Sequence, residues 1–176
     1  KAKIHSDEIK ALGGTELAVK LGAVSADHLM AITDSGIEAL KHSNTIANIL
    51  PSTSFYLNST YAPVRKMIDE GLAIALSSDY NPGSSPSENY MLTLNIAAIH
   101  LRMSPNEILN AATINPSFSV NRQGTTGVIA KDYNADFIIY DAKNWPYVLY
   151  HYGINHVKDV FKNGQLIVKN QQYIKE

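Results

Sequence analysis

Three polar residues of the types that bind metal ions, His5, His28 and Asp79, each lie at the carboxyl end of a short apolar run. Two imidazoles and a carboxylate form a donor set that suits zinc and related metals. Each residue alone has an ordinary explanation, because a lone histidine is more often structural and an aspartate after a strand often forms a turn or a helix cap. Their recurrence at the same end of successive runs favours a functional site.

The elements that must position these residues alternate between predicted strands and helices. Asp34 or Ser35 is expected to cap the second helix, and Ser104 with Glu107 forms a capping-box pattern at the last one. Four strand-then-helix units in succession predict a parallel sheet with helical crossovers. Strands are predicted over residues 2–5, 23–29, 45–50 and 72–78, and helices over 9–21, from 34 onward, and over 62–70, 88–102 and 105–113.

These units are too few for a closed barrel. A (β/α)8 barrel takes about 200 residues or more, so residues 1–122 are expected to form half of one, in a chain that begins in mid-protein. The carboxyl ends of barrel strands face one mouth, where His5, His28 and Asp79 would converge.

The pattern changes after Asn115 into a small β element. Residues 127–141 and 157–168 are predicted to be strands, and Asn163-Gly164 is a hairpin turn signal. Between them, residues 150–156 (YHYGINH) form an aromatic-rich stretch that is expected to serve packing or an interface.

Two polar segments flank the three candidate residues. Asp7 and Glu8 follow His5 closely enough to reach the same cavity, although a solvated loop or a first helical turn would also explain acids there. The loop over residues 81–86 follows Asp79 and can present N–H groups and hydroxyls to an anion. An ordinary strand-to-helix connection is an equally open explanation of this loop.

The composition argues against a nucleic-acid-binding protein, a membrane-spanning protein and a metal site made of cysteines. The chain of 176 residues has a formal net charge of -1, which gives no basic surface for nucleic acid or an anionic membrane. No apolar run approaches the roughly 20 residues that span a bilayer, and the start does not resemble a signal peptide, so a cytoplasmic protein is expected. Without cysteine, a metal can be held only by His, Asp or Glu. The remaining histidines (His42, His100, His151 and His156) are expected on helix surfaces or in packing.

Several strings together resemble the imidazolonepropionases, a family of the amidohydrolase superfamily. The resemblance runs through essentially the whole chain and implies the second half of a (β/α)8 TIM-type barrel over residues 1–122, followed by part of a composite β-sandwich over 123–176. NPGSSPSEN and YHYGINHV are the strings most specific to the family. The strings are KIHSDE, LGAVSADHL, LPSTSFYL, YAPVRKMIDEG, ALSSDYNPGSSPSEN, TINPSFSVNRQGTTGVIAKDYNADFIIYDA and YHYGINHV.

The resemblance also implies a role for each candidate residue at the metal. His5 and Asp79 correspond to ligands of one zinc or iron ion, and Asp79 would also move protons. His28 corresponds to the catalytic histidine beside the metal. Glu8 corresponds to the acid that binds the imidazolone ring and assists the water.

The substrate that the resemblance implies is 4-imidazolone-5-propanoate, hydrolysed to N-formimidoyl-L-glutamate in histidine degradation by a homo-oligomer such as a dimer. Asn81, Gly83 and Ser84 correspond to the substrate-binding residues that contact the ring-opened product, N-formimidoyl-L-glutamate. Two departures from the family stand out: residues 130–133 replace a usual glycine, and the H-x-H metal pair of the first barrel strand is absent from this chain. The isolated chain is therefore expected to be inactive.

Two other interpretations stay open. Another amidohydrolase, such as a cytosine-deaminase-like or dihydroorotase-like enzyme, would share the strand-end residues. The loop NPGSSP favours the imidazolonepropionase interpretation, because a deaminase needs no anion site for a propionate side chain. A metal-free structural half-barrel is the alternative from a different class of protein.

Overall fold

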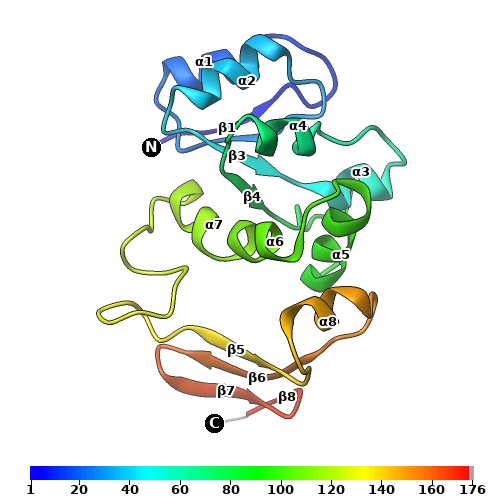
Figure 1. Cartoon of the computed structure of the whole chain (residues 1–176), viewed down its shortest axis with the longest axis vertical. Helices are drawn as coiled ribbons and strands as arrows, with labels where there is room; N and C mark the ends of the chain where they lie inside the picture. The colour runs from blue at the N-terminus through cyan, green and yellow to red at the C-terminus, as the bar shows by residue number, and fades with distance from the viewer. Residues whose placement is uncertain (175–176) are drawn as a thin grey trace.

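Two four-stranded sheets, one parallel and one antiparallel, organise the chain in a computed structural model that describes residues 1–174 (Figure 1). The parallel sheet has the order β1-β2-β3-β4, as expected from strands that alternate with helices. Its strands are β1 (Lys3–Ser6), β2 (Ser25–His28), β3 (Ile46–Ile49) and β4 (Ile74–Leu76).

The two faces of the parallel sheet differ in polarity. The register pairs His5 with Asp27 and Asp27 with Asn48, so these three polar residues share one face. The other face carries Ile4, Ala26, Ala47 and Ile74, which belong to or pack against the hydrophobic core. The core therefore lies on one side of the sheet and the chemistry-bearing side chains on the other.

Eight helices follow or connect these strands within residues 1–174. The capping box predicted for α6 is present, since Ser104 and Glu107 exchange side-chain-to-backbone hydrogen bonds. Three short helices, α3, α7 and α8, were not predicted. The helices are α1 (Gly14–Lys20), α2 (Asp34–Lys41), α3 (Pro51–Tyr56), α4 (Val64–Asp69), α5 (Tyr90–His100), α6 (Pro105–Ala112), α7 (Ile114–Ser119) and α8 (Trp145–Tyr150).

One predicted helix start and one predicted helix cap are wrong, although α2 begins at Asp34 as expected. The helix expected from residue 9 begins at Gly14, because the Asp7 carboxylate accepts the N–H groups of Leu12 and Gly14 and draws the preceding residues into a loop. The cap of α2 is Thr33, not Asp34 or Ser35, and its hydroxyl accepts the Gly36 N–H at 3.1 Å.

The antiparallel sheet lies at the opposite end of the molecule from α1 and α2 (Figure 1). The hairpin predicted at Asn163-Gly164 is confirmed, with both turn residues at positive φ between β6 and β7. The strand predicted over 127–141 is only β5, because Gly127 and Asp132 at positive φ turn the chain before it. The strands are β5 (Phe137–Tyr140), β6 (Val157–Lys162), β7 (Gln165–Lys169) and β8 (Gln172–Tyr173).

Helix α8 joins this second sheet to the helices of the first. The Trp145 indole N–H donates to the carbonyl of Pro105 at 2.7 Å, and the buried Asn95 amide donates to the carbonyl of Leu149 at 3.0 Å. The stretch over 150–156 lies between the strands β5 and β6, as expected, but it begins at the end of the unpredicted helix α8. Within residues 1–174, none of the helices is long and apolar enough to cross a membrane.

Candidate metal and catalytic site

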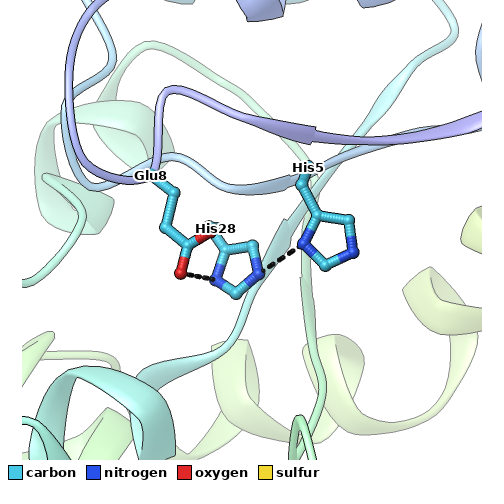
Figure 2. A group of neighbouring side chains, drawn as sticks. All are labelled: His5, Glu8 and His28. Atoms are coloured by element: carbon cyan, nitrogen blue, oxygen red, sulfur yellow. Dashed lines mark hydrogen bonds and ion pairs between the residues drawn. The ribbon is translucent and has the colours of Figure 1, made fainter. Parts of the chain in front are cut away.

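His5, Glu8 and His28 come together at the carboxyl ends of β1 and β2. Each offers one ligand atom, and the three atoms lie within 4.8 Å of one another. The Nδ1 atom of His5 lies 2.9 Å from Nε2 of His28, and Nδ1 of His28 lies 3.8 Å from a carboxylate oxygen of Glu8. Figure 2 shows His28 between the other two side chains, with one ring nitrogen turned to each. The arrangement is a row of three groups that can hold or pass a proton.

The backbone at the end of β2 makes this row possible. His28 and Leu29 adopt φ values of 79° and 65°, which non-glycine residues rarely do. Such strain costs about 1–3 kcal/mol per residue and concentrates at functional sites. The strand ends at this kink, and the His28 side chain turns toward His5.

The nitrogen atoms of the two imidazoles fit a metal on His5. Nε2 of His5 has no protein partner within residues 1–174, whereas Nδ1 is held by His28. A histidine that ligates through Nε2 carries its proton on Nδ1 and usually donates it to a neighbouring acceptor. His5 would then donate to Nε2 of His28, and neutral His28 would carry its own proton on Nδ1, facing Glu8.

His28 is 2% exposed, and its Nδ1 atom is buried without a hydrogen-bond partner among the described residues. Burying an unpaired polar atom is costly, and functional sites are where such atoms are found. Nδ1 of His28 is thus a buried nitrogen without a hydrogen-bond partner within residues 1–174, and it lies beside the Glu8 carboxylate.

Asp79 follows β4 but is not part of the three-residue cluster. Its carboxylate accepts a hydrogen bond from the buried hydroxyl of Thr53 in α3, and its backbone φ is 54°. Thr53 was not predicted, because the helix α3, whose first turn carries it to the sheet edge beside Asp79, was itself not predicted.

The loop after Asp79 is closed on itself. The side-chain oxygen of Asn81 accepts the N–H groups of Gly83 and Ser84, each at 2.8 Å, and its amide donates to the Ser84 hydroxyl at 2.9 Å. The donors that could meet an anion are therefore engaged within the loop, which fixes its shape beside Asp79.

Asp7 is a second residue that sequence reasoning did not single out for a role of its own. Burial raises the pKa of its carboxyl, but hydrogen bonds from Thr15, Leu12 and Gly14 outweigh burial and lower the pKa below its ordinary value. Asp7 is therefore a buried carboxylate beside the cluster that carries its charge.

The other histidines lie away from the cluster. His42 pairs with Glu38 at 2.8 Å on an exposed helix surface, and the ring of His100 stacks on Tyr61. His151 and His156 pack against Tyr147 near α8.

A cavity of about 830 Å³ lies at the opposite strand ends, among residues such as Val24, Thr45 and Leu72. No member of the three-residue cluster lines this cavity.

The fold agrees with a comparison to known families. A model of the amidohydrolase family matches residues 3–167, so the chain belongs to this family. It is 55% identical over 169 residues to an imidazolonepropionase of Fusobacterium nucleatum, covering 96% of this chain and 41% of that protein. It is 52% identical over 165 residues to an imidazolonepropionase of Bacillus mycoides, covering 93% and 39%. The chain thus spans about two fifths of the length of these curated relatives.

Solved structures of low sequence identity share the fold. A zinc-bound adenosine deaminase from Xanthomonas campestris superposes with a TM-score of 0.84 at 16% identity, covering 99% of this chain and 46% of that one. A zinc complex of the atrazine chlorohydrolase TrzN from Arthrobacter aurescens gives 0.78 at 17% identity, covering 98% and 45%.

Proposed function

We propose that the full-length protein containing this chain is an imidazolonepropionase, which hydrolyses 4-imidazolone-5-propanoate to N-formimidoyl-L-glutamate in histidine degradation. The observation that carries the proposal is identity of 52–55% to curated imidazolonepropionases across 93–96% of this chain. The amidohydrolase family model matches residues 3–167, which include His5, Glu8 and His28, and the structure gathers these three side chains into one cluster.

We further propose that the chain is the C-terminal portion of such an enzyme. Residues 1–122 would supply the second half of a (β/α)8 barrel, with the polar sheet face turned inward. Residues 123–176 would belong to a composite β-sandwich. The parallel order of β1 to β4 and the coverage of less than half of the solved structures support this arrangement.

One zinc or iron ion is the proposed cofactor, held in this chain by His5 and Asp79. His5 suits this role because its Nε2 is open while Nδ1 is held by His28. When bound, such an ion lowers the pKa of a water molecule to about 7 and polarises a carbonyl oxygen. The Asp79 carboxylate, which accepts a hydrogen bond from the Thr53 hydroxyl, must also face this ion.

Three residues of this chain have separate roles in proton transfer and hydrogen bonding during the proposed reaction. Asp79 accepts a proton from the attacking water and delivers it to the departing ring nitrogen. Nδ1 of His28 donates to the oxygen on which negative charge develops. Glu8, beside that nitrogen, binds the N–H of the imidazolone ring.

The loop of Asn81, Gly83 and Ser84 is the proposed site for the propionate end of the substrate. Its N–H groups now bind the Asn81 side-chain oxygen, so this oxygen marks a place where donors already converge. A carboxylate can take that place if the Asn81 side chain turns away.

We also propose that the full-length protein is a cytoplasmic homodimer.

The test is turnover by the purified full-length protein. With zinc or iron, the ring-opened product should appear from 4-imidazolone-5-propanoate, and a chelator should abolish the reaction reversibly. Cytosine and dihydroorotate serve as comparison substrates. Preference for either of these would replace the proposal with another amidohydrolase activity.

A further inference from the structure

We propose that Asp7 is a positioning residue, which holds the connection between β1 and α1 so that Glu8 faces His28. This inference rests on the proposed function, because it assigns the purpose of the buried carboxylate to a neighbouring catalytic group.

The Asp7 carboxylate organises the connection through four hydrogen bonds. One oxygen accepts the N–H groups of Leu12 and Gly14 at 2.9 and 3.2 Å. The other accepts the N–H and the hydroxyl of Thr15 at 3.0 and 2.6 Å. Because the side chain is buried and all donors come from residues five to eight positions later, the connection is folded around a single anion.

The Asp7 backbone ties the same connection to the chain after β2. Its carbonyl accepts the Ala31 N–H at 2.7 Å, and the preceding carbonyl of Ser6 accepts the Leu29 N–H at 3.1 Å. Both bonds are made by residues that follow His28, at and just after the kink. One residue therefore joins, through its side chain and backbone, both segments that carry the cluster.

Glu8 depends on this support. Residues 9–13 are exposed, and the contact with His28 at 3.8 Å is the one polar contact of the Glu8 carboxylate among the described residues. A longer, freely moving connection would let Glu8 sample many positions. The hydrogen bonds of Asp7 remove that freedom before the substrate arrives, and such preorganisation matters because small misplacements of catalytic groups reduce rates strongly.

An isosteric amide cannot replace this carboxylate. In Asp7→Asn, the NH2 group faces at least one backbone N–H whichever way the amide is turned: those of Leu12 and Gly14, or that of Thr15. Because only the Thr15 hydroxyl can accept as well as donate, at least one of the four hydrogen bonds is lost. Glu107→Gln provides a matched control, because it also weakens an acid that anchors a helix start, in α6, without touching the cluster.

The experiment compares Asp7→Asn, Glu8→Gln, the double variant and Glu107→Gln in the full-length, metal-loaded enzyme. Asp7→Asn should lower kcat/KM by about tenfold or more, with unchanged metal content. Combined with Glu8→Gln it should add less than about twofold, because both changes remove the same interaction. Hydrogen exchange should accelerate at the amides of residues 12, 14 and 15 in Asp7→Asn but not in Glu107→Gln.

Two variants of Thr15, which change the protein less than Asp7→Asn does, test the proposal if Asp7→Asn does not fold. Thr15→Val removes one of the four hydrogen bonds and should lower kcat/KM several-fold, whereas Thr15→Ser keeps the hydroxyl and should restore it. Full additivity of Asp7→Asn and Glu8→Gln, or activity equal to Glu107→Gln, would overturn the positioning role while leaving the proposed function intact. A wild-type enzyme that does not turn over 4-imidazolone-5-propanoate would instead overturn the proposed function and, with it, this role in the reaction.

Discussion

Nδ1 of His5 and Nε2 of His28 lie 2.9 Å apart, within hydrogen-bonding distance. The two residues are nevertheless not paired with each other in the parallel register of β1 and β2, where they are offset by one position. His5 is paired with Asp27, and His28 with Ser6. In regular strands, residues one step apart point to opposite faces, so His28 would point into the core side of the sheet. The positive φ of His28 resolves this conflict by ending the strand there. The site therefore depends on a local backbone distortion at the end of β2.

Replacing His28 with alanine tests the central donor of this row. We expect kcat of the full-length enzyme to fall on the order of 10²-fold or more, because a positioned acid–base or oxyanion donor is lost. His42→Ala, on an exposed helix surface, is the control and should leave kcat unchanged. Steady-state kinetics at saturating substrate measure both, and a normal rate in His28→Ala would remove this residue from the mechanism.

Replacing Ser84 with aspartate tests the substrate loop. A negative charge beside the proposed propionate site should mainly raise KM through repulsion, with a smaller effect on kcat. Ser87→Asp places the same charge further along the connection, outside the hydrogen bonds of Asn81, and serves as the control. Equal KM values for the wild type and Ser84→Asp would mean that the loop is only a connection.

Thr53→Val tests the support of Asp79. Valine keeps the shape of threonine but removes the hydroxyl that donates to the Asp79 carboxylate. Because Asp79 is a proposed metal ligand, we expect weaker metal retention, about 10-fold to 100-fold, as for other groups that orient ligands. Thr53→Ser should retain the metal as the wild type does. Metal content after dialysis against a chelator provides the measurement, and full retention in Thr53→Val would contradict the role.

Local sequence signals predicted the elements that are stabilised locally. The capping box of Ser104 and Glu107 and the hairpin at Asn163-Gly164 both appear as expected, since their hydrogen bonds form between residues close in sequence. The start of α1 was misplaced because it is set by Asp7, which lies seven residues before Gly14. Helix α8 was missed despite a readable signal, an Asn144 cap followed by proline near the helix start.

The candidate site likewise has some features that the sequence predicts and others that depend on contacts between distant segments. Placement at strand ends predicted that His5 and His28 would meet, and the structure brings Glu8 to them. The kink at His28 and the Thr53 contact with Asp79 could not be predicted, because they arise from tertiary packing between segments distant in sequence. The role of Asp79 as a ligand stays a prediction.

Glu107 should make stability depend on acidity. Its paired hydrogen bonds with Arg65, at 3.0 and 3.1 Å, together with the Ser104 N–H, lower its pKa to about 2 against the effect of burial. A depressed carboxyl pKa adds stability that is fully present above the ordinary value of 4.5 and is lost as pH falls from there toward about 2.

The variant Glu107→Gln should therefore be less stable than the wild type at pH 7, on the order of 1 kcal/mol, since the pair is partly exposed and solvent screens it. The difference should shrink as pH falls below about 4.5 and vanish near pH 2. Thermal midpoints at several pH values measure this, with Glu38→Gln on the exposed face of α2 as the control. A constant difference across the range would show that the charge of Glu107 does not contribute.

The 176-residue chain by itself should neither hydrolyse 4-imidazolone-5-propanoate nor hold zinc or iron tightly. It supplies His5 and Asp79 as proposed ligands, whereas a catalytic zinc normally has about three protein ligands and a water molecule. Within residues 1–174, the outer edges of β1 and β4 in the parallel sheet are also unpaired, and such edges favour self-association. The purified chain should therefore form oligomers if it folds, as sedimentation would show. Turnover at a normal enzymatic rate after addition of either metal would mean that the ligand set proposed above is wrong.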